Sequence, residues 1–126
     1  MIPMHLLAAL CLVESNGRNA INFHDRGRVS YGVCQIQART GLQYGLKHYS
    51  ELLNLHKNKL LAAKILTSHY RRFGNWDQAI MAYNAGPNKL PLRNWKYLKK
   101  VCDVWTQLKL ASPGPHAHIV ACLTKP

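Results

Sequence analysis

The sequence predicts a mainly α-helical protein with a single domain over residues 1–126. At 126 residues, the chain is long enough for one hydrophobic core and too short for two. Hydrophobic residues make up 48% of it, which is ordinary for a globular protein, and no low-complexity block indicates disorder. Apolar residues recur with helical spacing, whereas no alternating apolar run of strand length appears. These three observations favour one compact helical domain.

The first helix is expected at residues 4–14, within the apolar run MIPMHLLAALCLV. This run resembles the central part of a signal peptide, but it lacks a basic stretch before it and a small-residue cleavage site after it. It is also too short to span a bilayer. We therefore interpret it as a core helix. The following segment, 17–30, is polar and contains glycine, so it is expected to be a loop.

Three helices are expected in the middle of the chain, at 33–46, 50–56 and 58–73. Ser50 is a suitable N-cap for the second of them, and Glu51 would be favourable in its first turn. The third is amphipathic, because apolar residues recur on one face and basic residues on the other. Together these segments would supply much of the core.

A helix at 76–84 is expected to begin after Asn75, whose side chain can cap it, with Gln78 reaching back in a capping box. The sequence NAGP then supplies a glycine and a proline that end the helix. The last helix is expected at 91–110, with Pro91 in its first turn. Residues 110–126 would form a peripheral tail, in which the stretch HAHIVACL (116–123) could dock as a short strand or turn.

The four cysteines show neither a CxxC pair nor the spacing of metal ligands, so no metal site is expected. Cys11 and Cys34 lie in apolar contexts and are interpreted as small core residues. Cys102 and Cys122 flank the last loop and could form a disulfide in an oxidising compartment. No cofactor is expected either.

Glu14 is the residue that most strongly indicates chemistry. It follows the apolar residues 10–13 at the end of the first helix, in a chain with only five acidic residues. Partial burial and the negative end of the helix dipole both disfavour an ionised carboxyl there. A carboxylic acid that keeps its proton near neutral pH can act as a general acid, and protonation of a glycosidic oxygen suits it best.

A standard glycosidase needs a second carboxylate, and Asp25 is the only near candidate. If Asp25 does not serve, a group on the sugar itself must stabilise the oxocarbenium-like transition state. The sequence leaves both alternatives open at this point.

Five sequence blocks together resemble a known enzyme family. In order, they are ESNGRNAI (14–21), SYGVCQIQ (30–37), NKLLAAKIL (58–66), AIMAYNAGP (79–87) and YLKKV (97–101). The blocks are similar to those of the soluble lytic transglycosylases of glycoside hydrolase family 23, the relatives of goose-type lysozyme. The resemblance covers about residues 5–101 and implies a lysozyme-like α domain.

The resemblance implies cleavage of the MurNAc–GlcNAc β-1,4 bond of peptidoglycan with one catalytic glutamate, which matches Glu14. In the family this residue protonates the leaving oxygen and then serves as base while the MurNAc 6-hydroxyl closes onto C1. The product has a 1,6-anhydro end, and the substrate's 2-acetamido group replaces the second carboxylate.

Further substrate-binding residues follow from the same resemblance, one position at a time. Ser15 would position the carboxyl and the sugar, Gly32 would let substrate approach closely, and Gln35 would bind the N-acetyl or peptide-bearing side. The remaining positions expected at the cleft are Tyr83, Asn84, Tyr97, Asn22 and Asp25. The loop holding Asn22 and Asp25 departs from the family, which often has serines there.

Two alternatives remain beside the transglycosylase. Glu14, Asp25 and Ser30 loosely resemble the Glu–Asp–Thr arrangement of phage-type lysozymes, so a hydrolytic lysozyme using Asp25 and water is the closest rival. The formal net charge of +12 favours polyanions, and so a non-enzymatic binder of cell wall or nucleic acid is the second. No recognition helix or base-stacking array supports nucleic acid.

We expect a monomer that acts on peptidoglycan glycan strands and does not insert stably into a membrane. With no signal peptide recognised, it would be made in the cytoplasm. It would then reach the periplasm or exterior after holin release in a phage infection, or through a secretion or conjugation machine.

Overall fold

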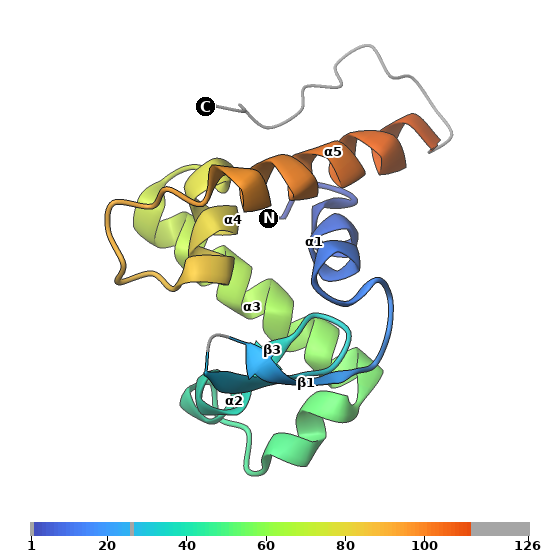
Figure 1. Ribbon diagram of the computed structural model, residues 1–126, viewed down its shortest axis with the longest axis vertical. Helices are drawn as coiled ribbons and strands as arrows, with labels where there is room; N and C mark the ends of the chain where they lie inside the picture. Colours follow the sequence, from blue (N-terminus) through green and yellow to red (C-terminus); the bar gives the residue numbers. More distant parts are fainter. Residues whose placement is uncertain (1, 26, 112–126) are drawn as a thin grey trace. The chain divides into compact units, whose positions relative to one another are not determined.

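The computed structural model describes residues 2–25 and 27–111 (Figure 1). The prediction of a mainly α fold is confirmed. The helices and strands, in chain order, are α1 (Leu6–Ser15), β1 (Ile21–Asp25), β2 (Arg28–Tyr31), β3 (Ile36–Gln37), α2 (Ala38–Gln43), the 3-10 helix η1 (Tyr49–Leu53), α3 (Leu55–Phe73), α4 (Trp76–Ala85) and α5 (Trp95–Ala111). In the part of the chain described, no helix combines the length and the apolar character needed to cross a bilayer.

The chain divides into two compact units. One unit, Cys11–Lys64, is continuous in sequence and is called the inner unit; the segments that flank it in sequence, Met1–Leu10 and Ile65–Pro126, make up the unit called outer. The boundaries fall inside α1 and α3, so each of these helices contributes residues to both units.

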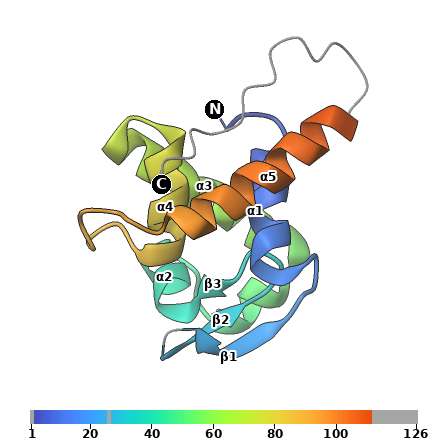
Figure 2. The ribbon, with the colours of Figure 1, turned by 45° about the horizontal axis from the view of Figure 1, so that its top comes forward.

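The inner unit contains a three-stranded antiparallel sheet in the order β1–β2–β3 (Figure 2). Ile21 pairs with Tyr31 and Ser30 pairs with Gln37, with an irregular register near the β1–β2 turn. The expectation of a loop over 17–30 was therefore wrong. Four of the five residues of β1 are exposed, and consecutive residues lie on opposite faces of the sheet. Because neither face of the strand is buried, its sequence shows no alternation of apolar and polar residues.

The helix expected at 33–46 is also corrected, because only Ala38–Gln43 is helical. Gly32 has φ +84° and Gln35 has φ +53°, which is left-handed backbone that an α-helix excludes. Val33 and Ile36 are buried all the same, one in a turn and the other in β3. Their spacing imitated the inner face of a helix.

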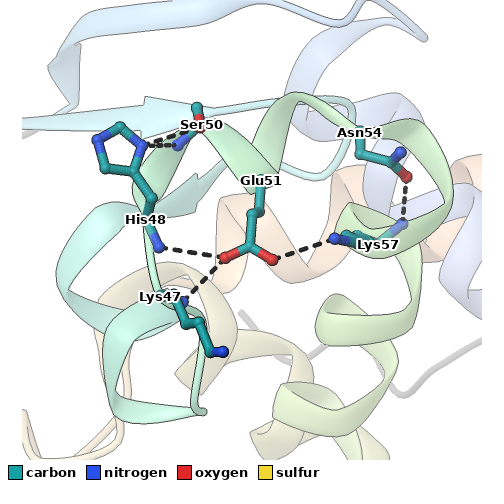
Figure 3. Close-up of polar contacts among 6 residues, drawn as sticks. All are labelled: Lys47, His48, Ser50, Glu51, Asn54 and Lys57. Atoms are coloured by element: carbon teal, nitrogen blue, oxygen red, sulfur yellow. Dashed lines mark hydrogen bonds and ion pairs between the residues drawn. The ribbon is translucent and has the colours of Figure 1, made fainter.

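The 3-10 helix η1 begins with a capping box, and its N-cap lies two residues before the one expected from the sequence. The N-cap is His48 rather than Ser50, and His48 Nδ1 accepts a hydrogen bond from Ser50 N at 3.2 Å (Figure 3). The Glu51 carboxylate accepts from Lys47 N at 2.9 Å and from His48 N at 3.1 Å, and it pairs with Lys57 Nζ at 3.1 Å. The bond from Lys57 and those two backbone bonds lower the pKa of Glu51. Its expected place in the first turn is confirmed.

In the outer unit, α4 begins and ends as predicted within a residue. Asn75 Oδ1 accepts from Gln78 N at 2.8 Å, which is the expected N-cap bond. Gly86 has φ +95°, and its N–H donates to Ala82 O at 2.8 Å to close the last turn.

The last helix, α5, starts four residues later than expected, at Trp95 instead of Pro91. Leu92 is buried in the preceding loop, and so its spacing from Trp95 imitates one more helical turn. Trp105 Nε1 donates to Met4 O at 2.9 Å, which fastens the N-terminal segment to α5. The side chains buried in the outer unit are Leu6, Ala9, Leu10, Ile65, Leu66, His69, Ala79, Ile80, Met81, Ala82, Leu92, Leu98, Val101, Cys102 and Trp105.

Two predictions fall at the C-terminal end. Cys102 is fully buried in α5, whereas Cys122 lies outside the described residues, so their pairing stays a prediction. The expected tail 110–126 includes the last two residues of α5, and the rest of it lies outside the described residues.

His69 makes the stability of the protein depend on pH. Its side chain is 8% exposed, and burial, followed by the charge of Arg72, lowers its pKa below the ordinary value of 6.5. Because the unfolded chain binds this proton at higher pH than the folded chain does, stability is fully present above pH 6.5 and is lost as pH falls through the folded pKa. The free energy of unfolding should therefore fall between about pH 7.5 and about pH 5.

Urea unfolding curves across this range would measure the effect. His69→Gln should flatten the slope, whereas His56→Gln, which changes an exposed histidine on the same helix, should leave it unchanged. An unaltered slope in the His69 variant would contradict the assignment.

Candidate active site

Glu14 lies in the last turn of α1 and is half-buried. The three residues before it change from buried Cys11 through exposed Leu12 to half-buried Val13, so the helix leaves the core at this point. A carboxyl here is partly shielded from water and still accessible. The placement suits a general acid, which must keep a proton and yet reach a substrate.

The end of α1 is fastened to the turn at residues 32–35 by two links. Ser15 Oγ donates to Val33 O at 2.6 Å, with Cys11 O farther away at 3.3 Å. Cys11, which lies one helical turn before Glu14 in α1, forms a disulfide with Cys34. Both links tie the residues beside Glu14 to the segment that was expected to line the cleft.

The disulfide is a feature that the interpretation of Cys11 and Cys34 as small core residues did not include. Both side chains are buried as expected, at 4% and 0% exposure, but they are bonded to each other. They are separated by 23 positions, and an apolar context looks the same around a buried thiol and a buried disulfide. Only the even cysteine count was a signal.

Gln35 stabilises the turn through its own side chain. Its Nε2 donates to Ala20 O at 3.0 Å and to Gly32 O at 2.9 Å, and Gly32 N donates to Ala20 O at 2.8 Å. Both amide hydrogens are therefore used, whereas Oε1 has no hydrogen-bond partner among the described residues. Gln35 can offer a ligand an acceptor, and a matching group must be an N–H or O–H donor.

Gly32 is required by packing inside the inner unit. A Cβ at this position would lie 2.2 Å from Asn58 Nδ2 and 2.4 Å from Leu52 O, far inside contact distance. The positive φ of the residue adds a second reason for glycine. The family resemblance had suggested that Gly32 allows close approach of the substrate. In the structure, Asn58 and Leu52 of the protein itself lie where a side chain would be.

Asp25 is the last residue of β1, and its carboxylate is held by neighbouring strands. Its Oδ2 accepts from Ser30 Oγ of β2 and from Gln37 Nε2 of β3 at 3.5 Å. Ser30 is fully buried. Asn22 is exposed on β1, where its Oδ1 accepts from His24 N at 3.0 Å. Glu14, Ser15, Asn22, Asp25, Gly32 and Gln35 all belong to the inner unit.

Tyr83, Asn84 and Tyr97 belong to the outer unit, where all three are half-buried. Asn94, which the sequence did not single out, donates through Nδ2 to Asn84 Oδ1 at 2.9 Å and to Met81 O at 3.0 Å. Asn84 is thus oriented at the end of α4 by the residue that precedes α5. Roles for these three residues beside Glu14 stay predictions.

Asn58 is a buried residue beside the 32–35 turn that the sequence interpretation did not single out. It is fully buried and hydrogen-bonded to three main-chain groups around the turn. A signal was present, because Asn58 shares the helical spacing of Leu61, Ala62 and Ile65 and so is a polar residue on the apolar stripe. Among the residues described, no three His, Cys, Asp or Glu side chains are grouped as a metal ion would need.

Comparison with known proteins agrees with the mainly α fold. Residues 1–105 match the family described as "Transglycosylase SLT domain". Protein IpgF of Shigella flexneri is 30% identical over 116 residues, which cover 88% of this chain and 75% of that protein. Protein IpgF of Shigella sonnei aligns with the same identity and coverage. No solved structure gives a significant match.

Proposed function

Because this chain belongs to the SLT family of transglycosylases, we propose that it is a peptidoglycan lytic transglycosylase with Glu14 as its single acid/base. The bond it cleaves is the β-1,4 bond between MurNAc and GlcNAc, and its products end in 1,6-anhydro-MurNAc. Family membership supports peptidoglycan as the substrate class. The residue roles and the product are the proposal.

The reaction proceeds in two proton transfers. Glu14 first donates its proton to the glycosidic oxygen, and the bond between this oxygen and C1 of MurNAc breaks. The substrate's 2-acetamido group stabilises the positive charge that develops at C1, in place of a second carboxylate. The 6-hydroxyl of the same sugar then bonds to C1, and its proton returns to Glu14. No water is consumed, and the enzyme ends with Glu14 protonated again.

The attachment of the α1 end to the 32–35 turn is the observation that supports this proposal most directly. The Ser15–Val33 hydrogen bond and the Cys11–Cys34 disulfide flank Glu14 on both sides in sequence. A general acid must be held within a fraction of an ångström of its target oxygen, and a rigid helix end meets that need.

A hydrolytic lysozyme is the second candidate, and the anchoring of Asp25 favours it. Ser30 and Gln37 both donate to one oxygen of this carboxylate, which fixes it on the sheet of the same unit that contains Glu14. A fixed carboxylate can activate a water or stabilise the charged sugar. The two candidates differ in whether water or the 6-hydroxyl attacks C1.

Product analysis on purified sacculi separates them. Mass spectrometry of the released muropeptides should show ends lighter by one water than reducing-end MurNAc. Asp25→Asn should then retain most of the activity, because the anhydro route needs no second carboxylate. Reducing ends in place of anhydro ends, with activity lost in the Asp25 variant, would overturn the proposal in favour of the lysozyme.

The biological role proposed is degradation of the cell wall. It would be host lysis by a phage enzyme released through a membrane pore, or local opening of the wall for a secretion or conjugation machine. The net charge of +12 suits both, because it favours encounter with an anionic wall polymer.

A further inference from the structure

Asn58 connects three separate pieces of main chain in the inner unit. Its Nδ2 donates to Tyr31 O at 2.9 Å and to Leu52 O at 2.8 Å, and its Oδ1 accepts from Cys34 N at 2.8 Å. The side chain is completely buried. Both amide hydrogens therefore form hydrogen bonds, one at the end of β2 and one near the end of η1. The carbonyl oxygen accepts a hydrogen bond from the turn that follows β2.

The amide also occupies the space beside Gly32 in which a side chain would lie, as its 2.2 Å approach to the ideal Cβ position shows. It thus spans the turn from Tyr31 to Cys34 on that side. Gly32 and Gln35 both have positive φ, and for a non-glycine residue such as Gln35 this conformation is unfavourable. A turn of this kind persists only when the surroundings determine it, and Asn58 supplies three of the fixed points.

The same turn carries the contacts that the proposed reaction needs. Val33 O accepts the hydrogen bond of the Ser15 hydroxyl, one residue after Glu14. Gln35 binds two carbonyls through Nε2, and its Oε1 has no hydrogen-bond partner among the described residues. Any shift of the turn would move both groups together. None of these contacts involves Asn58 directly, and so it would act through the residues it holds.

We propose that Asn58 is a positioning residue for substrate binding, which fixes the 32–35 turn so that Gln35 Oε1 accepts a hydrogen bond from an N–H or O–H donor of the glycan. This inference rests on the proposed function for the identity of the ligand, a glycan strand rich in acetamido and hydroxyl groups. It assigns Asn58 to binding rather than to chemistry, because Asn58 lies behind the turn and is wholly buried.

Steady-state kinetics on soluble, uncrosslinked glycan strands tests the assignment. Asn58→Ala removes all three bonds, and Asn58→Asp keeps the shape and the bond from Cys34 N while it loses the amide donors. Each folded variant should raise KM about tenfold or more and change kcat much less, as expected for loss of support behind a binding residue. If the alanine variant does not fold, the aspartate variant carries the test.

Leu61→Ala is the matched control, because Leu61 is 5% exposed on the same helix in the same unit. Its cavity should lower the urea concentration at which half of the protein is unfolded. If the role of Asn58 is purely structural, Asn58→Asp and Leu61→Ala should change KM alike when the two variants are compared at equal fractions of folded protein. Positioning through Gln35 predicts that Asn58→Asp has little further effect on KM in a Gln35→Ala background, and full additivity of the two changes would overturn the proposal.

A binding measurement distinguishes failure of this inference from failure of the proposed function. Calorimetry with the same glycan strands would compare Glu14→Gln with the Glu14→Gln, Asn58→Asp double variant, and needs no cleavage. A Kd about tenfold weaker in the double variant supports the positioning role even if the wild type releases no anhydro product. An unchanged Kd overturns it even if the wild type is an active transglycosylase.

Discussion

Glu14→Gln should lower the release of glycan fragments from sacculi by about 10²–10⁴-fold, the usual contribution of a general acid. Glutamine fills nearly the same volume at the end of α1, but it has no acidic proton to give to the glycosidic oxygen. It cannot take the proton of the 6-hydroxyl afterwards either. Both halves of the proposed reaction fail together, which makes this the largest effect expected of any single substitution.

The measurement is the rate of muropeptide release, followed by mass spectrometry of the products. Glu51→Gln is the matched control, because it makes the same chemical change on η1, where the carboxylate caps a helix and pairs with Lys57. This control should keep its rate within about twofold, since it is not part of the proposed machinery. If Glu14→Gln retained muralytic activity, the enzymatic assignment would have to be abandoned, and the non-enzymatic basic binder would become the better interpretation.

Removing the Cys11–Cys34 disulfide should have the largest effect on stability. Closing a loop with a sequence separation of 23 restricts the unfolded chain, and the chain-entropy relation gives about 3.4 kcal/mol for a loop of this length. The Cys11→Ala, Cys34→Ala double variant should therefore unfold at a lower urea concentration with a similar slope. Both cysteines are buried, so the small cavities left by alanine act in the same direction.

Activity gives a second readout of the same variant. The disulfide joins Cys11, one helical turn before Glu14 in α1, to Cys34, the residue before Gln35. Its loss should therefore lower activity even at temperatures where the variant is fully folded. Comparison with the wild type in the absence of reductant leaves the state of Cys102 unchanged in both proteins. Equal stability and equal activity would show that Ser15 and Asn58 hold the site without the covalent link.

The features predictable from the sequence are those that depend on local signals. Asn75 and Gly86 have strong capping preferences, and the bounds of α4 were predicted within one residue. The long amphipathic helix α3 was found from its spacing. The position of Glu14 at the exit of α1 from the core followed from the apolar run before it.

The features that the sequence did not reveal depend on contacts between distant residues. β1 is exposed on both faces, so only its pairing with β2 makes it a strand. The turn at 32–35 was mistaken for a helix because its left-handed residues are held by Asn58 and by the side chain of Gln35. The cap of η1 was misplaced because histidine is an uncommon N-cap residue.

The disulfide also has a topological consequence. The main chain from Cys11 to Cys34 and the bond between the two sulfur atoms form a closed covalent ring, and Glu14, Asp25 and Gly32 are all members of it. A protease that cuts the ring once, for instance beside the 65% exposed Phe23 of β1, opens it without releasing a fragment. The acid and the turn that supports it therefore stay on one molecule after such a cut.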